Sequence, residues 1–224
     1  RFGVHQRLML AAKGKGVDVL VMTATPIPRT LTLTAYGDMD VSRLDEKPPG
    51  RKPIDTRLIP LEKMEEMVDG LARQIKAGAR VYWVCPLVEE SELLDLAAAE
   101  ERYDVLKAQF GDRVGLVHGR LKPTEKDDVM RKFAGGDLDI LVATTVIEVG
   151  VNVPEATIMV IEHAERFGLS QLHQLRGRVG RGGDKSYCFL LYAGPLGETA
   201  KERLAIMRQT EDGFLISEKD LELR

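Results

Sequence analysis

The chain has 224 residues, 44% hydrophobic and 30% charged, with a formal net charge of −3. This length can bury a large α/β core, and the acidic balance argues against a broadly basic nucleic-acid surface while leaving room for a local basic stripe. No apolar run approaches the ~18 residues that a membrane span needs. Cys85 and Cys188 stand in apolar runs without a C-x-x-C pattern, and the histidines lack zinc-ligand spacing. We therefore expect two inert core thiols and no metal site made by this chain.

The first predicted strand is the apolar run Val17–Met22, which suits a strand buried on both faces of a parallel sheet. Thr23 and Thr25 follow at its carboxyl end, where open α/β sheets place their ligands. A helix is expected over residues 29–36. Residues 47–53 are dense in proline and charge, and we interpret them as an extended linker between two domains.

After this segment, short apolar runs alternate with segments of helical periodicity. Apolar residues recur at three- and four-residue spacing over 61–77, and acidic residues precede basic ones over 123–133, as the helix dipole favours. This alternation predicts a parallel, doubly wound α/β sheet with helices on both faces. The expected strands are 54–59, 80–85, 114–117, 139–143, 157–161 and 186–192, and the expected helices are 61–77, 93–110 and 123–133.

The carboxyl-terminal part reads as helical. Residues 197–210 predict an amphipathic helix rich in lysine and arginine, which Gly213 should end. Residues 214–224 then begin another element. The chain starts without a methionine and stops in the middle of a pattern, so we expect it to be a fragment of a longer protein.

Three arginines and two glycines fall within Gln174–Arg181, directly after a helix that Ser170 is expected to open. Guanidinium groups hold phosphate oxygens through planar paired donors, and the same chemistry stabilises charge on a transferring phosphoryl group. Taken alone, this run fits a solvated Arg/Gly loop about equally well.

Two other segments could contact phosphates. Thr144 and Thr145 follow an apolar strand, and Gly150 would permit close approach of the backbone. Residues 118–120 place a glycine and a cation between a strand and a helix start, which suits a phosphate site. For residues 144–154 the alternative is an ordinary strand–loop–strand connection, and for residues 118–120 it is a capping loop in which His118 makes a local hydrogen bond.

Taken in chain order, four segments resemble the motifs of superfamily 2 helicases. Residues 23–25 are similar to motif III, 82–88 to motif IV, 144–154 to motif V and 174–181 to motif VI. We expect Trp83, inside the motif IV segment, to be a core residue. The resemblance implies that motif VI, on the second of two RecA-like domains, reaches across a cleft to ATP held by the first.

Further segments narrow the resemblance. Residues 1–7, 23–30, 48–53 and 165–171 look like the RecG family of bacterial branch-migration helicases, and the likeness covers essentially the whole chain. It implies a fold with a RecA-like parallel sheet and a C-terminal helical segment.

The same resemblance implies a division of the chain. Residues 1–46 would be the tail of the first RecA-like domain and 47–53 the linker. Residues 54–195 would be the second RecA-like domain, and 196–224 would begin a helical hairpin that links ATP turnover to translocation.

Roles carry over residue by residue from the family. Asn152 stands where the family has a ribose-binding Asp; it can still hydrogen-bond a hydroxyl but has no charge. The implied set is Arg178 and Arg181 as ATP-facing catalytic residues; Gln174, Gly150 and Asn152 at the nucleotide; Thr144, His118, Gly119 and Arg120 on the nucleic-acid backbone; and Thr23, Thr25, Arg203 and Arg208 in coupling.

Neither a G-x-x-x-x-G-K-[ST] loop nor a D-E-x-H sequence occurs. The resemblance therefore implies that the phosphate cradle and the Mg²⁺ ligand lie upstream, and we expect this chain alone to lack ATPase activity. The whole protein would use ATP and Mg²⁺ to move along double-stranded DNA. It would remodel stalled forks and Holliday junctions in repair and recombination, as a cytoplasmic monomer.

Two other interpretations remain open. The transcription-repair coupling factor family shares the spelling of 23–30 but is less similar at 48–53. A non-catalytic RecA-like binding module is the other, although such a module would have no need of both Arg178 and Arg181. A phosphate-binding loop in the upstream sequence would favour an enzyme.

Overall fold

The computed structural model describes residues 42–44, 46–86, 92–144 and 153–223, and also Met9, Leu20 and Met22. The expectations for residues 1–7, for 23–36 with Thr23 and Thr25, and for Gly150 and Asn152 lie outside the described residues. Of the expected buried strand 17–22, only Leu20 and Met22 are described. Both are exposed and neither belongs to a strand, contrary to the expectation of a buried strand.

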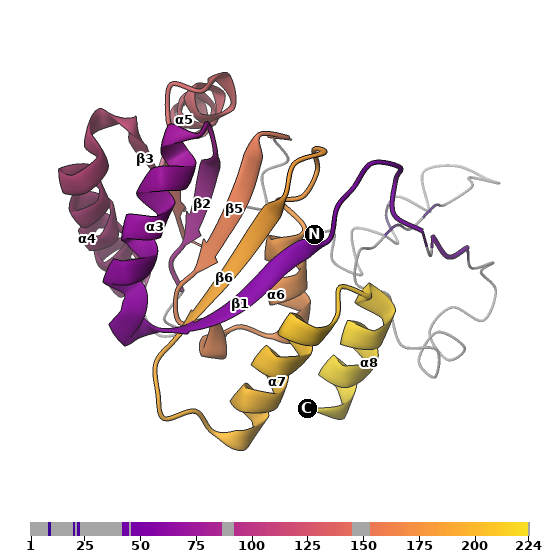
Figure 1. Cartoon of the computed structure of the whole chain (residues 1–224). Helices are drawn as coiled ribbons and strands as arrows, with labels where there is room; N and C mark the ends of the chain where they lie inside the picture. Colours follow the sequence, from indigo (N-terminus) through magenta and orange to yellow (C-terminus); the bar gives the residue numbers. More distant parts are fainter. Residues whose placement is uncertain are drawn as a thin grey trace.

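A six-stranded, fully parallel sheet forms the centre of the molecule, in the order β1-β6-β5-β2-β4-β3 (Figure 1). The central strands are short apolar runs, and all four residues of β4 are buried, as expected for a sheet covered on both faces. The strands are β1 (Ile54–Pro60), β2 (Arg80–Val84), β3 (Val114–Val117), β4 (Ile140–Ala143), β5 (Ala156–Ile161) and β6 (Ser186–Tyr192).

Helices cover both faces of the sheet, which confirms the predicted architecture. Alternation along β2 divides the core, because Trp83 packs on the face covered by α3 and α4, whereas Tyr82 packs against α5 on the other face. The helices are α3 (Met64–Lys76), α4 (Glu92–Phe110), α5 (Pro123–Gly135), α6 (Leu169–Arg176), α7 (Glu198–Gln209) and α8 (Gly213–Glu222), with 3-10 turns η1 (Leu61–Lys63), η2 (Gly111–Arg113) and η3 (Ala164–Arg166).

The start of α6 differs from the expectation. The helix begins at Leu169, after Gly168, and Gln171 Oε1 accepts the Gly168 N–H at 3.1 Å. Ser170 lies inside the first turn, and its hydroxyl donates to Asp220 of α8 at 3.1 Å. The prediction that Ser170 opens the helix was therefore wrong, because its hydroxyl is committed to a tertiary contact.

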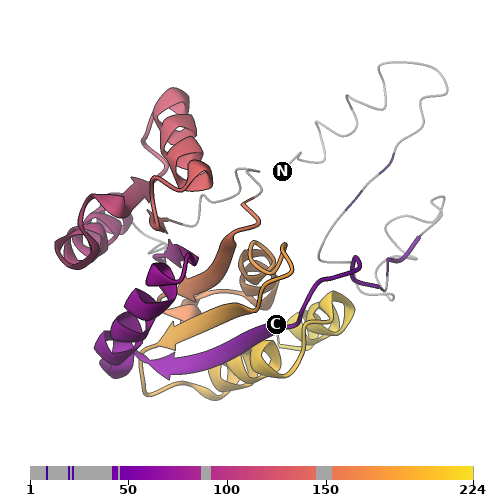
Figure 2. The ribbon, with the colours of Figure 1, turned by 45° about the horizontal axis from the view of Figure 1, so that its top comes forward.

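The end of α7 also differs. Gly213 is the first residue of α8 and does not end α7, which stops at Gln209. Asp212 caps the new helix, since its Oδ1 accepts the N–H groups of Phe214 and Leu215. In Figure 2, α7 lies beside β1. The following helix, α8, packs against α6 and α7.

Both cysteines are free and buried, as expected of core thiols. Burial raises the pKa of the Cys188 thiol to about 12, and burial also raises the pKa of Cys85. Neither thiol is suited to act as a nucleophile at neutral pH. In the part of the chain that the structure describes, no helix has both the length and the apolar character needed to cross a membrane.

Candidate functional site

The structure places the two sets of candidate residues at opposite ends of the parallel strands. These two sides of the sheet are called its amino edge and its carboxyl edge. In a parallel sheet, all amino ends of the strands meet at one edge and all carboxyl ends at the other. The loop 177–185 joins α6 to the amino end of β6, whereas residues 118–120 and Thr144 follow the carboxyl ends of β3 and β4. The loop 177–185, called the arginine loop, therefore lies at the opposite end of the strands from the segments expected to contact nucleic acid.

Arg176 is the anchor of the arginine loop. It is only 2% exposed, and its guanidinium donates to the carbonyl oxygens of Met207 at 2.5 Å and Thr210 at 2.9 Å, and to the Thr56 hydroxyl at 3.3 Å. Burial lowers the pKa of Arg176, yet an arginine stays protonated in proteins. This residue thus joins α6 to β1 and to the end of α7. Sequence reasoning gave Arg176 no individual role.

Arg178 and Arg181 lie half-buried in the loop that Arg176 anchors. Arg181 Nε donates to the Gly177 carbonyl at 3.2 Å. Burial, and then the like charge of Arg178, lower the pKa of Arg181, with Arg51 adding to the effect. Among the described residues, Arg178 has no ion pair with a carboxylate. Two neighbouring guanidiniums repel each other, so the arrangement favours an anion with several oxygens.

Two glycines let this loop pack tightly. Gly180 has φ +72°, and a Cβ there would lie 2.9 Å from Ile54 Cγ1 at the start of β1. A Cβ on Gly182 would lie 3.1 Å from the Pro154 carbonyl oxygen. The backbone therefore approaches the amino ends of two strands more closely than a side chain would allow. This contact positions the arginines.

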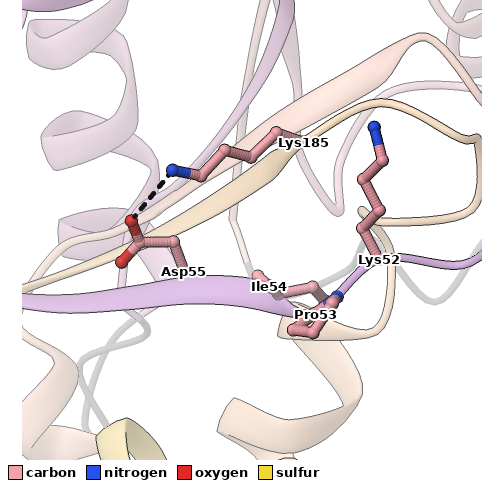
Figure 3. Close-up of a pocket in the computed structure, with 5 residues that line it drawn as sticks. All are labelled: Lys52, Pro53, Ile54, Asp55 and Lys185. Atoms are coloured by element: carbon pink, nitrogen blue, oxygen red, sulfur yellow. Dashed lines mark ion pairs between the residues drawn. The ribbon is translucent and has the colours of Figure 1, made fainter.

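A shallow depression of about 410 Å³ lies at the same edge, lined by Lys52, Pro53, Ile54, Asp55 and Lys185 (Figure 3). Lys185 Nζ lies 3.8 Å from Asp55 Oδ2, whereas the side chain of Lys52 points away from that pair. The hydrogen bond from Arg57 is the largest of the effects that lower the pKa of Asp55. The depression thus adds lysine charge to the edge that carries the arginine loop.

The opposite edge carries the segments expected to contact nucleic acid. His118 and Thr144 directly follow Val117 and Ala143, which pair in register, so the two residues are neighbours at this edge. Gly119 and Arg120 are exposed. Thr144 is 3% exposed, and its N–H donates to the Val117 carbonyl.

The segment after β3 is held by the start of α5. Lys126 Nζ donates to the Gly119 carbonyl at 3.0 Å, and Glu125 Oε2 accepts the Lys122 N–H at 2.8 Å. His118 Nδ1 is buried and has no hydrogen-bond partner among the described residues. A buried polar atom of this kind is open to a ligand atom or a water molecule.

The remaining candidates are distributed differently. Arg203 Nη1 donates to the carbonyls of Phe167 at 2.9 Å and Glu165 at 3.4 Å, so this guanidinium holds η3 against α7. Arg208 is exposed on the same helix, and Gln174 is half-buried on α6. The two arginines of α7 therefore differ: the Arg203 guanidinium donates to carbonyls within the chain, whereas the Arg208 side chain is exposed.

The donor set fits a phosphate-bearing ligand better than a metal ion. Guanidinium groups at the amino edge supply donors only. Within residues 46–86, 92–144 and 153–223, no group of three or more His, Cys, Asp or Glu side chains could hold a metal ion.

Several known proteins are similar to this chain in sequence and in fold. Residues 62–183 match the family described as the helicase conserved C-terminal domain. Over its whole length, the chain is 56% identical to the ATP-dependent DNA helicase RecG of Acidithiobacillus ferridurans and 55% identical to that of Escherichia coli (strain K12). It covers 33% of each of these proteins, so it spans about a third of the length of the curated relatives it matches.

A solved structure, that of RecG bound to a three-way DNA junction, is similar to this chain with a TM-score of 0.80 and 51% identity. The match covers 95% of this chain and 28% of that one. The six-stranded parallel sheet with helices on both faces is the RecA-like fold of such domains. Because more than half of its residues lie within the matched family, the chain belongs to the helicase conserved C-terminal domain family.

Proposed function

We propose that this chain is one part of a longer ATP-dependent translocase of the RecG kind. The whole protein would move along double-stranded DNA, remodel stalled forks and Holliday junctions in repair and recombination, and act as a cytoplasmic monomer. The full-length similarity to RecG supports this function. The observation that carries it is the pair of neighbouring guanidiniums, Arg178 and Arg181, on a loop that Arg176 and two glycines hold in place.

The arginine loop would complete an ATP site whose other wall belongs to a preceding RecA-like domain. ATP supplies the phosphoryl group when bound, and Mg²⁺ would be held mainly by that preceding domain. Arg178 and Arg181 stabilise the negative charge that develops on the transferring group. Gln174, Gly150 and Asn152 are the proposed nucleotide neighbours. Arg176 positions the loop and makes no contact with ATP itself.

The opposite edge would follow the DNA. His118, Gly119, Arg120 and Thr144 are proposed to contact the phosphate backbone. Thr23, Thr25, Arg203 and Arg208 are the proposed coupling residues. In the same proposal, residues 1–46 close the preceding domain, 47–53 form the linker, 54–195 form the second RecA-like domain and 196–224 begin the translocation hairpin.

The test compares ATP hydrolysis by the full-length protein on three nucleic acids, namely a branched DNA, a linear duplex and a single-stranded RNA. We expect the branched DNA to stimulate most strongly, and the 224-residue chain alone to show negligible turnover. Equal stimulation by RNA would argue for an RNA helicase. Turnover by the isolated chain near the full-length rate would overturn the two-domain ATP site.

A further inference from the structure

The turn between α7 and α8, residues 210–212, bonds to two separate parts of the chain. On one side, Arg176 of the arginine-bearing helix donates to the Thr210 carbonyl at 2.9 Å. On the other, Glu211 Oε1 accepts the Ile54 N–H at 2.6 Å, and its Oε2 pairs with Lys47 Nζ. The two carboxylate oxygens therefore hold both ends of the segment 47–54, which lies about 160 positions earlier in the sequence.

Neighbouring contacts stiffen this junction. The Arg43 guanidinium lies 4.6 Å from the centre of the Phe214 ring, at the start of α8. Asp212 caps α8 through its side chain, and its N–H donates to the Thr210 hydroxyl at 3.0 Å. The Glu211 side chain is only 22% exposed. Removing a half-buried carboxylate that accepts a backbone N–H costs more stability than removing one partner of a fully exposed ion pair.

We propose that Glu211 is a positioning residue that fastens segment 47–54 to the α7–α8 turn, so that motion of this segment reaches the arginine loop through Thr210 and Arg176. The proposal rests on the proposed function, in which 47–53 is the linker from the ATP-holding domain. Thr210 and Glu211 are adjacent in the chain, and they bond to opposite partners. A displacement of the segment at Glu211 therefore bears on Arg176, two residues before Arg178.

The test uses three substitutions in the full-length protein. Glu211→Ala removes both contacts, Glu211→Gln keeps an oxygen for the Ile54 N–H, and Lys47→Met removes only the ion pair. The matched control is Glu198→Ala, which removes an exposed carboxylate and its Lys201 pair from the same hairpin. Two quantities are measured for each variant: ATP hydrolysed at saturating forked DNA, and base pairs unwound per ATP.

For Glu211→Ala we expect ATP hydrolysis to change by less than about 2-fold, while base pairs unwound per ATP fall by about 3- to 10-fold. Glu211→Gln should recover most of the loss, and Glu198→Ala should match the parent. A parallel loss of hydrolysis and unwinding, or an unchanged ratio, would overturn the positioning role. Combining Lys47→Met with Glu211→Gln should give a less than additive loss, because both remove the same ion pair.

A second measurement does not depend on catalysis. Trypsin can cut after Arg51, inside the fastened segment, and we expect Glu211→Ala to raise this cleavage rate about 3- to 10-fold relative to Glu198→Ala. An unchanged cleavage rate would overturn the fastening. If the parent showed no DNA-stimulated ATP hydrolysis, the proposed function would fail, yet the cleavage rates would still decide whether Glu211 fastens the segment.

Discussion

The two edges of the sheet expose their cations in different ways. At the amino edge, Arg178 and Arg181 follow a buried arginine that donates to backbone carbonyls, and the loop packs against strand ends through glycines. At the carboxyl edge, Arg120 is exposed on a segment held by one lysine-to-carbonyl bond and the start of α5. The amino edge presents donors supported by buried contacts, and the carboxyl edge presents an exposed side chain on a supported backbone.

This difference matches two kinds of phosphate recognition. Stabilising charge on a transferring phosphoryl group requires donors already in place, since reorganisation during reaction would forfeit their benefit. Contacts with a nucleic-acid backbone are many and individually weak, so each can tolerate an exposed side chain. Substitutions at the two edges should therefore differ in size and in the quantity they change.

The largest effect is expected at the amino edge. Arg178→Ala or Arg181→Ala in the full-length protein should lower kcat for ATP hydrolysis by about 10³-fold, because charge stabilisation is lost. DNA affinity, measured by titration of a labelled fork, should stay near the parent value. The control is Arg73→Ala, an exposed arginine on α3. Loss of DNA affinity with normal turnover would contradict the assignment of the ATP site to the amino edge and of DNA contact to the carboxyl edge.

The anchor should be distinguishable from the residues it supports. Arg176→Met should lower the free energy of unfolding of the chain by about 2–4 kcal/mol, because buried carbonyl oxygens lose their donor. Arg178→Met, at a half-buried position, should change it by less than about 1 kcal/mol. Urea titrations of both variants make the comparison. Equal losses would contradict the view that Arg176, and not Arg178, supports the loop.

A smaller effect is expected at the carboxyl edge. Arg120→Ala should weaken binding to duplex DNA by about 3- to 10-fold and reduce the slope of log affinity against log salt by about 1, because one phosphate contact is lost. Turnover at saturating DNA should be retained. Arg131→Ala, an exposed arginine farther along α5, is the control and should keep the parental slope. A fall in kcat for Arg120→Ala would contradict the view that the carboxyl edge contacts DNA without taking part in ATP hydrolysis.

The smallest effect concerns pH. Burial, and then the charge of Arg176, lower the pKa of His173 from 6.5 to about 4. Between these values the unfolded chain binds a proton that the folded chain does not, so stability contributed by neutral His173 is lost as pH falls below about 6.5. The Tm of the parent should therefore drop more between pH 7.5 and pH 5 than that of His173→Gln. Equal drops would mean that His173 takes up its proton without strain beside Arg176.

Much of the fold was predictable because its signals are local. Apolar runs of strand length, separated by helical periodicity, predicted the strands of the sheet and helices on both of its faces. One error occurred where a tertiary partner decided the outcome, since Ser170 bonds to α8 and does not cap its own helix. The other concerned a local signal, since Asp212 caps a helix that begins at Gly213, where the preceding helix was expected to end.

By itself, the sequence determined the parallel α/β core, the burial of its cysteines and the presence of an arginine-rich segment that could hold phosphate, because these depend on residue type and short-range spacing. Only the tertiary structure decided which arginine turns inward, since the carbonyls that hold Arg176 come from α7 and the turn after it. It alone brought Glu211 to Ile54, 157 positions away. Contacts between distant segments depend on how the helices pack on the sheet, and no local pattern records that packing.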